Sequence, residues 1–169
     1  PPGVLKILAA GSQESIKIII TTSDDSTLND KSRILVGERP VVDIRILKGS
    51  QEITDLGGQQ IRITIPYDIA SSENISKLLV YYINENGESI PVVLSMYDEE
   101  NKCMVFETIH LSLYAVGYND VSFRDVLNHW AKGNIEFLAA REVIKGKDAE
   151  NFDPDGNITR AEFVTMLVN

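Results

Sequence analysis

The sequence predicts a multidomain α+β chain: an all-β sandwich of antiparallel strands over residues 1–118, followed by a small helical unit over residues 119–169. Two observations predict this division. Up to about Tyr118, apolar residues recur at every second position, which is typical of half-buried strands. Beyond Asn119 they recur at helical spacing. The net charge of −9 is spread over both parts, so the change of period alone sets the boundary near Asn119.

The strands are predicted by alternation and by the turns between them. Apolar residues alternate at Ile16/Ile18/Ile20, Val42/Ile44/Ile46, Ile61/Ile63/Ile65 and Leu79/Tyr81/Ile83. Turn-forming residues separate them at Ser23-Asp24-Asp25-Ser26, Gly57-Gly58, Asn84-Glu85-Asn86-Gly87 and Asp98-Glu99-Glu100-Asn101. This spacing predicts roughly seven to nine short strands, with Pro66 and Pro91 at strand ends or edges. From Val4 to Gln59 the prediction rests on this pattern alone.

Two helices are predicted in the second part. The stripes are Trp130, Ile135, Leu138 and Ala139, then Ala161, Val164, Thr165 and Val168. A unit of about 50 residues with two helices buries too little apolar surface to be stable without neighbours. We therefore expect it to dock on the sandwich or to self-associate.

Composition excludes several classes of function. The chain is 43% hydrophobic, as expected for a folded protein, and its net charge of −9 argues against nucleic acid as a partner. No apolar run approaches the roughly 20 residues that span a bilayer, so we expect no membrane insertion. Cys103 is the single cysteine, which excludes an intramolecular disulfide and predicts a small buried apolar residue. The start at Pro1-Pro2-Gly3 carries no signal peptide, so we expect an internal or C-terminal piece of a longer protein.

The most informative segment is residues 123–162. It contains Phe123-Arg124-Asp125-Val126, His129-Trp130-Ala131, Ile144-Lys145-Gly146, Phe152-Asp153-Pro154 and Ile158-Thr159-Arg160-Ala161-Glu162. In this order and spacing the segment resembles an S-layer homology repeat. The resemblance implies a non-catalytic module of an extracellular bacterial surface protein, which binds a secondary cell-wall polysaccharide, commonly a pyruvylated one. Repeats of this family usually occur in threes that share binding grooves, whereas this chain has one copy, so self-association through the incomplete array is also expected.

Thr159 and Glu162 have a structural explanation of their own, because Thr-x-x-Glu is a capping box that starts a helix. Arg160 does not, since the helix dipole disfavours a cation in the first turn. Either an anion joins it at the helix start, or it pairs with Asp125 or Asp155. The resemblance favours the first alternative, with the ketal carboxylate of a pyruvylated sugar as the anion.

The remaining candidate ligand residues rest mainly on the resemblance. Trp130 lies on the apolar stripe, where an aromatic residue is more often core than a sugar platform, although the family's position borders the pocket. Asp125 is expected to cap or buttress the first helix. The turn at Lys145-Gly146-Lys147 would let backbone and two cations approach a ligand. The candidate ligand-binding set is Arg160, Asp125, Trp130, Gly146, Lys145, Thr159 and Glu162.

Residues 151–162 also match the spacing of an EF-hand calcium loop, with Asp153, Asp155 and Glu162 as candidate ligands. Asn151 at the first position and Pro154 at the fourth are atypical, and Glu162 is already used by the capping box. We therefore expect neither a metal nor another cofactor.

The triplet His110-Leu111-Ser112 raises a rival function. Self-cleaving sandwiches of the adhesion-receptor and ZU5 types break such a sequence before the hydroxyl residue, with His110 as base and Ser112 as nucleophile. A similar ending also looks like that of β-modules that precede S-layer homology repeats, so we favour an ordinary last strand. No other catalytic pattern is evident, and we expect no enzyme activity. The two alternatives are a self-processing sandwich that cleaves at Leu111-Ser112 and a protein-interaction module of a surface complex.

Overall fold

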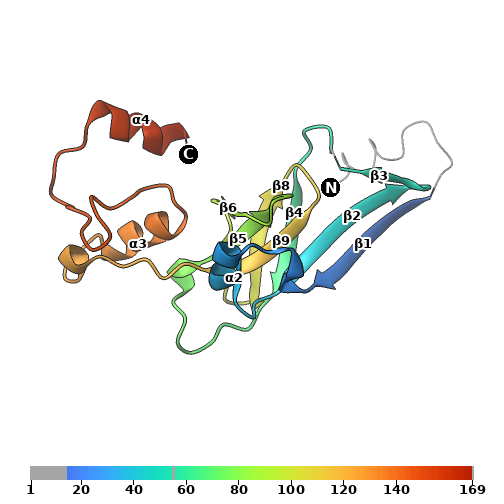
Figure 1. Cartoon of the computed structure of the whole chain (residues 1–169), viewed down its shortest axis with the longest axis horizontal. Coiled ribbons are helices and arrows are strands. Elements are labelled where there is room, and N and C mark those ends of the chain that lie inside the picture. Colours follow the sequence, from blue (N-terminus) through green and yellow to red (C-terminus); the bar gives the residue numbers. More distant parts are fainter. Residues whose placement is uncertain (1–14, 55, 169) are drawn as a thin grey trace.

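The computed structural model describes residues 15–54 and 56–168, and it contains the predicted sandwich (Figure 1). The pattern from Val4 to Glu14 lies outside the described residues. Nine strands occur in the described part: β1 (Ile16–Ser23), β2 (Val41–Lys48), β3 (Gln51–Ile53), β4 (Ile61–Pro66), β5 (Leu78–Ile83), β6 (Ser89–Val92), β7 (Met96–Asp98), β8 (Cys103–Thr108) and β9 (Leu113–Tyr118). The larger sheet has the order β1-β2-β9-β5-β6, with β3 paired to β2, and the smaller has the order β4-β8-β7. All pairs are antiparallel.

The main core fills the space between the two sheets. Its buried side chains come from the inner face of each sheet and include Ile44, Val80, Phe106, Tyr114 and Val116. The rings of Phe106 and Tyr114 lie 4.8 Å apart between their centroids. The predicted burial of Cys103 is confirmed, as is the placement of Pro66 at the end of β4 and of Pro91 in the edge strand β6.

A helix that the sequence analysis did not predict, α2 (Asp30–Val36), covers the other face of the larger sheet. Under it lie Leu79, Tyr81 and Ile83 of β5, packed with Leu28 and Val36. The expectation of half-buried strands is therefore wrong for β5. The run from Leu78 to Ile83 is continuously apolar because the sandwich core covers one of its faces and α2 covers the other.

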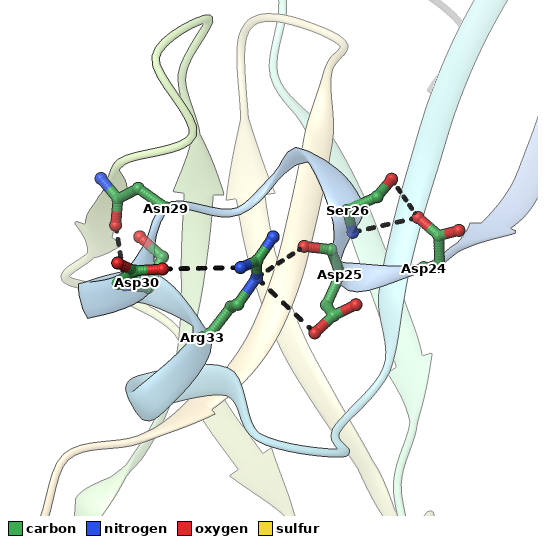
Figure 2. A network of polar contacts seen from close by, with 7 residues as sticks. Asp24, Asp25, Ser26, Asn29, Asp30 and Arg33 are labelled. Atoms are coloured by element: carbon green, nitrogen blue, oxygen red, sulfur yellow. Dashed lines mark hydrogen bonds and ion pairs between the residues drawn. The ribbon is translucent and has the colours of Figure 1, made fainter.

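Polar side chains explain why α2 begins where it does. The Asn29 side chain accepts a hydrogen bond of 2.9 Å from the Ser32 amide, which caps the helix. Arg33 reaches back to the carboxylates of Asp25 and Asp30, at 3.7 and 3.5 Å (Figure 2). The turn predicted at Ser23 to Ser26 is thus the end of β1 and a short 3-10 turn, η1 (Asp25–Thr27), that leads into α2.

The second part holds a 3-10 turn, η3 (Arg124–Val126), and the helices α3 (Lys132–Ala140) and α4 (Arg160–Val168). It has its own small core of Phe123, Val126, Ile135, Ala139 and Ile144. Among the described residues, no helix is both long enough and apolar enough to cross a bilayer.

The α3 end of this part docks on the sandwich through buried polar contacts. The Arg141 guanidinium, 2% exposed, donates hydrogen bonds of 2.9 Å to the carbonyls of Ser76, Leu78 and Ser95. Lys77, the last residue of η2 (Ile75–Lys77), forms an ion pair of 2.6 Å with Asp120. These contacts confirm the expectation that the helical unit docks on the sandwich.

Candidate functional site

The loop that leads to α4 is held by Asp125. Its carboxylate accepts hydrogen bonds from the backbone amides of Phe152, at 2.9 Å, and Asp153, at 2.6 Å. The Phe152 amide is the main reason that the pKa of Asp125 lies below its ordinary value. The expectation that Asp125 caps or buttresses the first helix is therefore wrong. It lies in η3, ahead of that helix, and ties two distant segments together.

The capping box at the start of α4 is confirmed. Glu162 accepts a 2.7 Å hydrogen bond from the Thr159 amide, and the Thr159 hydroxyl oxygen accepts a 3.2 Å bond from the Glu162 amide. Glu162 also pairs with Lys147, whose ammonium lies 2.8 Å away. The bond from Lys147, followed by the bond from the Thr159 amide, lowers the pKa of Glu162 to about 2. Glu162 is thus a charged brace between α4 and the turn at residues 145–147.

A groove of about 550 Å³ lies between that turn, the loop from Phe152 to Ile158, and α4. It brings together three of the residues in the candidate set, Lys145, Gly146 and Glu162. The close access of a ligand to the backbone at Gly146 stays a prediction, and the surroundings of this residue give a separate reason for a glycine. A Cβ at Gly146 would lie 2.5 Å from the Phe123 ring and 2.6 Å from the Asp148 carbonyl. The glycine therefore makes room for the Phe123 ring.

Arg160 is exposed as the first residue of α4, next to Ala161, which lines the groove. Its guanidinium has no ion pair or hydrogen bond to any residue in the described part of the chain. The two intramolecular partners that the sequence offered are used elsewhere: Asp125 binds the amides of the loop, and Asp155 lies 3.7 Å from His129. Within the described residues, neither of these carboxylates therefore compensates the charge of Arg160.

Trp130 is 87% exposed, so its interpretation as a core residue on a helix stripe is wrong. The reason is local, because α3 begins only at Lys132. The His129 imidazole accepts a 3.2 Å hydrogen bond from the Ala131 amide, which fixes a turn that leaves the indole outside the small core. Trp130 does not line the groove. Its ring lies against that of His129, with 5.4 Å between the centroids.

The EF-hand spacing does not assemble a calcium site. The Asp153 carboxylate lies against Gly156, Asp155 lies near His129, and Glu162 binds Lys147. Within residues 15–54 and 56–168, no group of three His, Cys, Asp or Glu side chains is arranged to hold a metal.

The triplet His110-Leu111-Ser112 lies in the connection between β8 and β9, not in the last strand as expected. The His110 ring nitrogen Nδ1 contacts the Tyr114 hydroxyl at 3.1 Å. Neither Leu111 nor Ser112 has a positive φ, and the Ser112 carbonyl accepts a ladder hydrogen bond of 3.1 Å from the Ile44 amide. The connection is therefore well paired, and its backbone is not strained at the Leu111–Ser112 bond.

The sequence alone does not predict the contacts of two cations in this part, Arg141 and Lys147. The sequence does not distinguish Arg141, because a cation after the last helical residue is a common surface feature. Lys147 was treated only as a cation that approaches a ligand, whereas Glu162 neutralises it. The sequence signal that bears on the Lys147–Glu162 ion pair is the capping box, because it fixes where the Glu162 carboxylate lies.

Comparisons with known proteins bear on both parts. The S-layer homology domain family matches residues 122–164. Over 128 residues, 76% of this chain and 7% of the relative, the chain is 31% identical to an amylopullulanase of Thermoanaerobacterium thermosulfurigenes. It is 44% identical to the S-layer protein EA1 of Bacillus anthracis over 48 residues, 28% of this chain and 6% of that protein. It is 42% identical over 48 residues to endo-1,4-beta-xylanase A of Thermoanaerobacterium saccharolyticum, 28% of this chain and 4% of the enzyme.

The matched segments are less than a tenth of the length of these relatives. The amylopullulanase match is longer than the helical part, so it extends into the strands. No solved structure matches the chain.

Proposed function

Residues 122–164 of this chain are an S-layer homology domain, and from this premise we propose that the helical part attaches the protein non-covalently to a secondary cell-wall polysaccharide. The family match and the similarity to S-layer proteins support a cell-wall anchoring module at the cell surface. The proposal concerns the ligand and the residues that bind it.

The observation that carries the proposal is the unpaired guanidinium of Arg160 at the start of α4. A cation at this position is disfavoured by the helix dipole, and no carboxylate of the described chain compensates it. An arginine fork matches a carboxylate in a bidentate geometry. The ketal carboxylate of a pyruvylated sugar would supply that anion, and the helix amides would add to its attraction.

The surrounding residues divide into binding and supporting roles. Lys145, in the groove lining and exposed, adds a second cation near the same helix. The exposed ring of Trp130 offers an apolar platform for a sugar face, elsewhere on the same domain. Thr159, Glu162 and Asp125 act indirectly, because their side chains fix α4 and its leading loop. Gly146 supports the site through the packing of Phe123.

We propose further that the chain itself is not an enzyme. Two relatives carry names of polysaccharide-degrading enzymes, but the matched segments are 7% and 4% of their lengths. Their catalytic activity is therefore expected to lie outside the matched segments.

The test compares two exposed arginines of the same domain. Arg160→Ala is expected to weaken co-sedimentation with purified wall polysaccharide at least tenfold, because a charge-assisted bidentate contact contributes roughly 1.5–3 kcal/mol. Arg124→Ala is the matched control, since Arg124 is 75% exposed but already pairs with Glu150 at 2.9 Å. Polymer from which the pyruvyl groups have been removed should bind both variants equally weakly. Equal binding of Arg160→Ala and the parent chain would reject the assignment.

A further inference from the structure

The edges of the two sheets differ in how well they are protected from pairing with another strand. The edge strand β6 has four residues and includes Pro91, and β7 and β3 have three residues each. The edge strand β4 carries Arg62 and ends at Pro66. Short strands, prolines and charges are the usual means by which an exposed edge is blocked. Four of the edges in the described part therefore have such protection.

The fifth edge, β1, has the least protection. It is eight residues long, it contains no proline, and its pairing with β2 runs from Ile16 to Ser23 without a bulge. Its one charged residue is Lys17. The remaining residues are isoleucine, threonine and serine, and the first two favour strands. β1 is thus a long, regular edge that can accept another strand.

The same strand exposes apolar surface. Ile18 and Ile20 lie opposite Ile46 and Ile44 of β2, which places them on the face of the larger sheet that forms the sandwich core. They are nevertheless 58% and 66% exposed. Because these two side chains remain exposed beside the core, an additional strand next to β1 would help to cover them.

The hydrogen-bonding pattern identifies the free groups. The Gly49 amide donates to the Ser15 carbonyl at 2.9 Å, so odd-numbered residues of β1 are bonded to β2. The amides and carbonyls of Ile18 and Ile20 therefore point to the open edge, together with those of Ile16 and Thr22.

We propose that β1 is a docking edge for a second copy of this chain, which adds its own β1 in antiparallel orientation. The register centred on Ile19 overlaps residues 16–22, seven of the eight residues of β1, and sets Ile18 opposite Ile20 of the second copy. Lys17 then faces Thr21 of the second copy, so no like charges are opposed. The strand is thereby self-complementary in its apolar residues, and it opposes no like charges. This interface is separate from the proposed wall-binding site.

Disulfide trapping tests the register. In the proposed dimer the two Ile19 Cα atoms form a non-hydrogen-bonded pair about 4.5 Å apart, within the range of a disulfide. Ile19→Cys should therefore give a covalent dimer under mild oxidation. The matched control is Thr21→Cys on the same face of the strand, where the two Cα atoms would be more than about 13 Å apart. Cys103 is buried, so the parent chain serves as the blank.

Adding Ile20→Lys to the Ile19→Cys chain should abolish the covalent dimer. Adding Ile90→Lys, at an exposed isoleucine of the edge strand β6, should leave it intact. Equal cross-linking of Ile19→Cys and Thr21→Cys, or none in either, would overturn the proposal.

Amide hydrogen exchange of the unmodified chain separates the possible occupants of the edge. The amides of Ile18 and Ile20 should exchange slowly at high protein concentration and faster on dilution. Slow exchange at every concentration would mean that another segment of the same chain covers the edge. Fast exchange at every concentration would mean that nothing does. Either of these two results contradicts the second copy as occupant.

Discussion

The two halves of the helical part each have an arginine next to a helix end, but the two arginines have opposite surroundings. Arg141 follows the last residue of α3, where the helix dipole favours a cation, and three carbonyls of the sandwich enclose its guanidinium. Arg160 begins α4, where the dipole disfavours a cation, and it is exposed without a partner in the described chain.

The apolar residues of the two helices differ in the same way. Ile135, Ala139 and Ala140 of α3 are buried, whereas Phe163 and Leu167 of α4 are 51% and 69% exposed. The α3 half is therefore buried, in the small core of the helical part and through Arg141 against the sandwich, whereas the side chains of the α4 half remain exposed.

The largest effect is expected at the docked half. Arg141→Met keeps an apolar stem but leaves the buried carbonyls of Ser76, Leu78 and Ser95 without their donor, which should cost about 3 kcal/mol of unfolding free energy. Urea denaturation measures this loss. The control Arg124→Met removes a surface ion pair and should stay within about 0.5 kcal/mol of the parent. Similar stabilities for the two variants would show that Arg141 does not hold the parts together.

A smaller effect is expected at the start of α4. Thr159→Ala removes the oxygen that caps the Glu162 amide and should cost about 1 kcal/mol of helix stability. Because α4 makes few buried contacts, this loss should appear as faster amide exchange within α4 rather than in α3. Thr159→Ser, which keeps the oxygen, should restore the slower rate. Uniform acceleration across both helices would mean that they unfold as one unit.

Acid should weaken the α4 half. The folded-state pKa of Glu162 is lowered to about 2, so its contribution is fully present above its ordinary value near 4.5 and is lost as the pH falls toward 2. Amide exchange of α4 should therefore increase, relative to α3, between pH 4.5 and 2. Glu162→Gln should remove this additional pH dependence, and an unchanged profile in that variant would assign it to another carboxyl group.

The smallest effect on stability is expected on the exposed face of α4. Phe163→Gln or Leu167→Gln should change unfolding free energy by no more than about 0.5 kcal/mol, since neither side chain is buried. If the incomplete array associates through this face, both variants should reduce the weight-average mass measured by sedimentation equilibrium. Destabilisation by several kcal/mol would instead show that α4 packs against the rest of the chain.

The strands could be predicted because alternation is a local property. All four alternating segments lie in strands, and the capping box also follows from four consecutive residues. The helix α2 could not be predicted in this way, because seven residues from Asp30 to Val36 span only about two helical turns. Its presence is nevertheless reflected in β5, whose unbroken apolar run requires cover on both faces.

A local turn and several long-range contacts account for the remaining differences between prediction and structure. Trp130 and Ile135 fit one helical stripe by spacing, but a turn fixed by His129 delays the helix and exposes the indole. Asp125 binds amides 27 and 28 residues away, and Arg141 binds carbonyls 46 to 65 residues away. No local pattern specifies such partners.

We propose that the α4 half binds the wall polymer while the α3 half fixes it to the sandwich. Titration of the isotope-labelled chain with purified pyruvylated wall polysaccharide, followed through the arginine Nε–H and backbone amide resonances, tests it most directly. The Arg160 Nε–H and the amides around Thr159 and Lys145 should shift with polymer concentration, while the Arg141 Nε–H and the strand amides stay in place. Shifts centred on the sandwich, or an unperturbed Arg160 in the bound chain, would contradict the account.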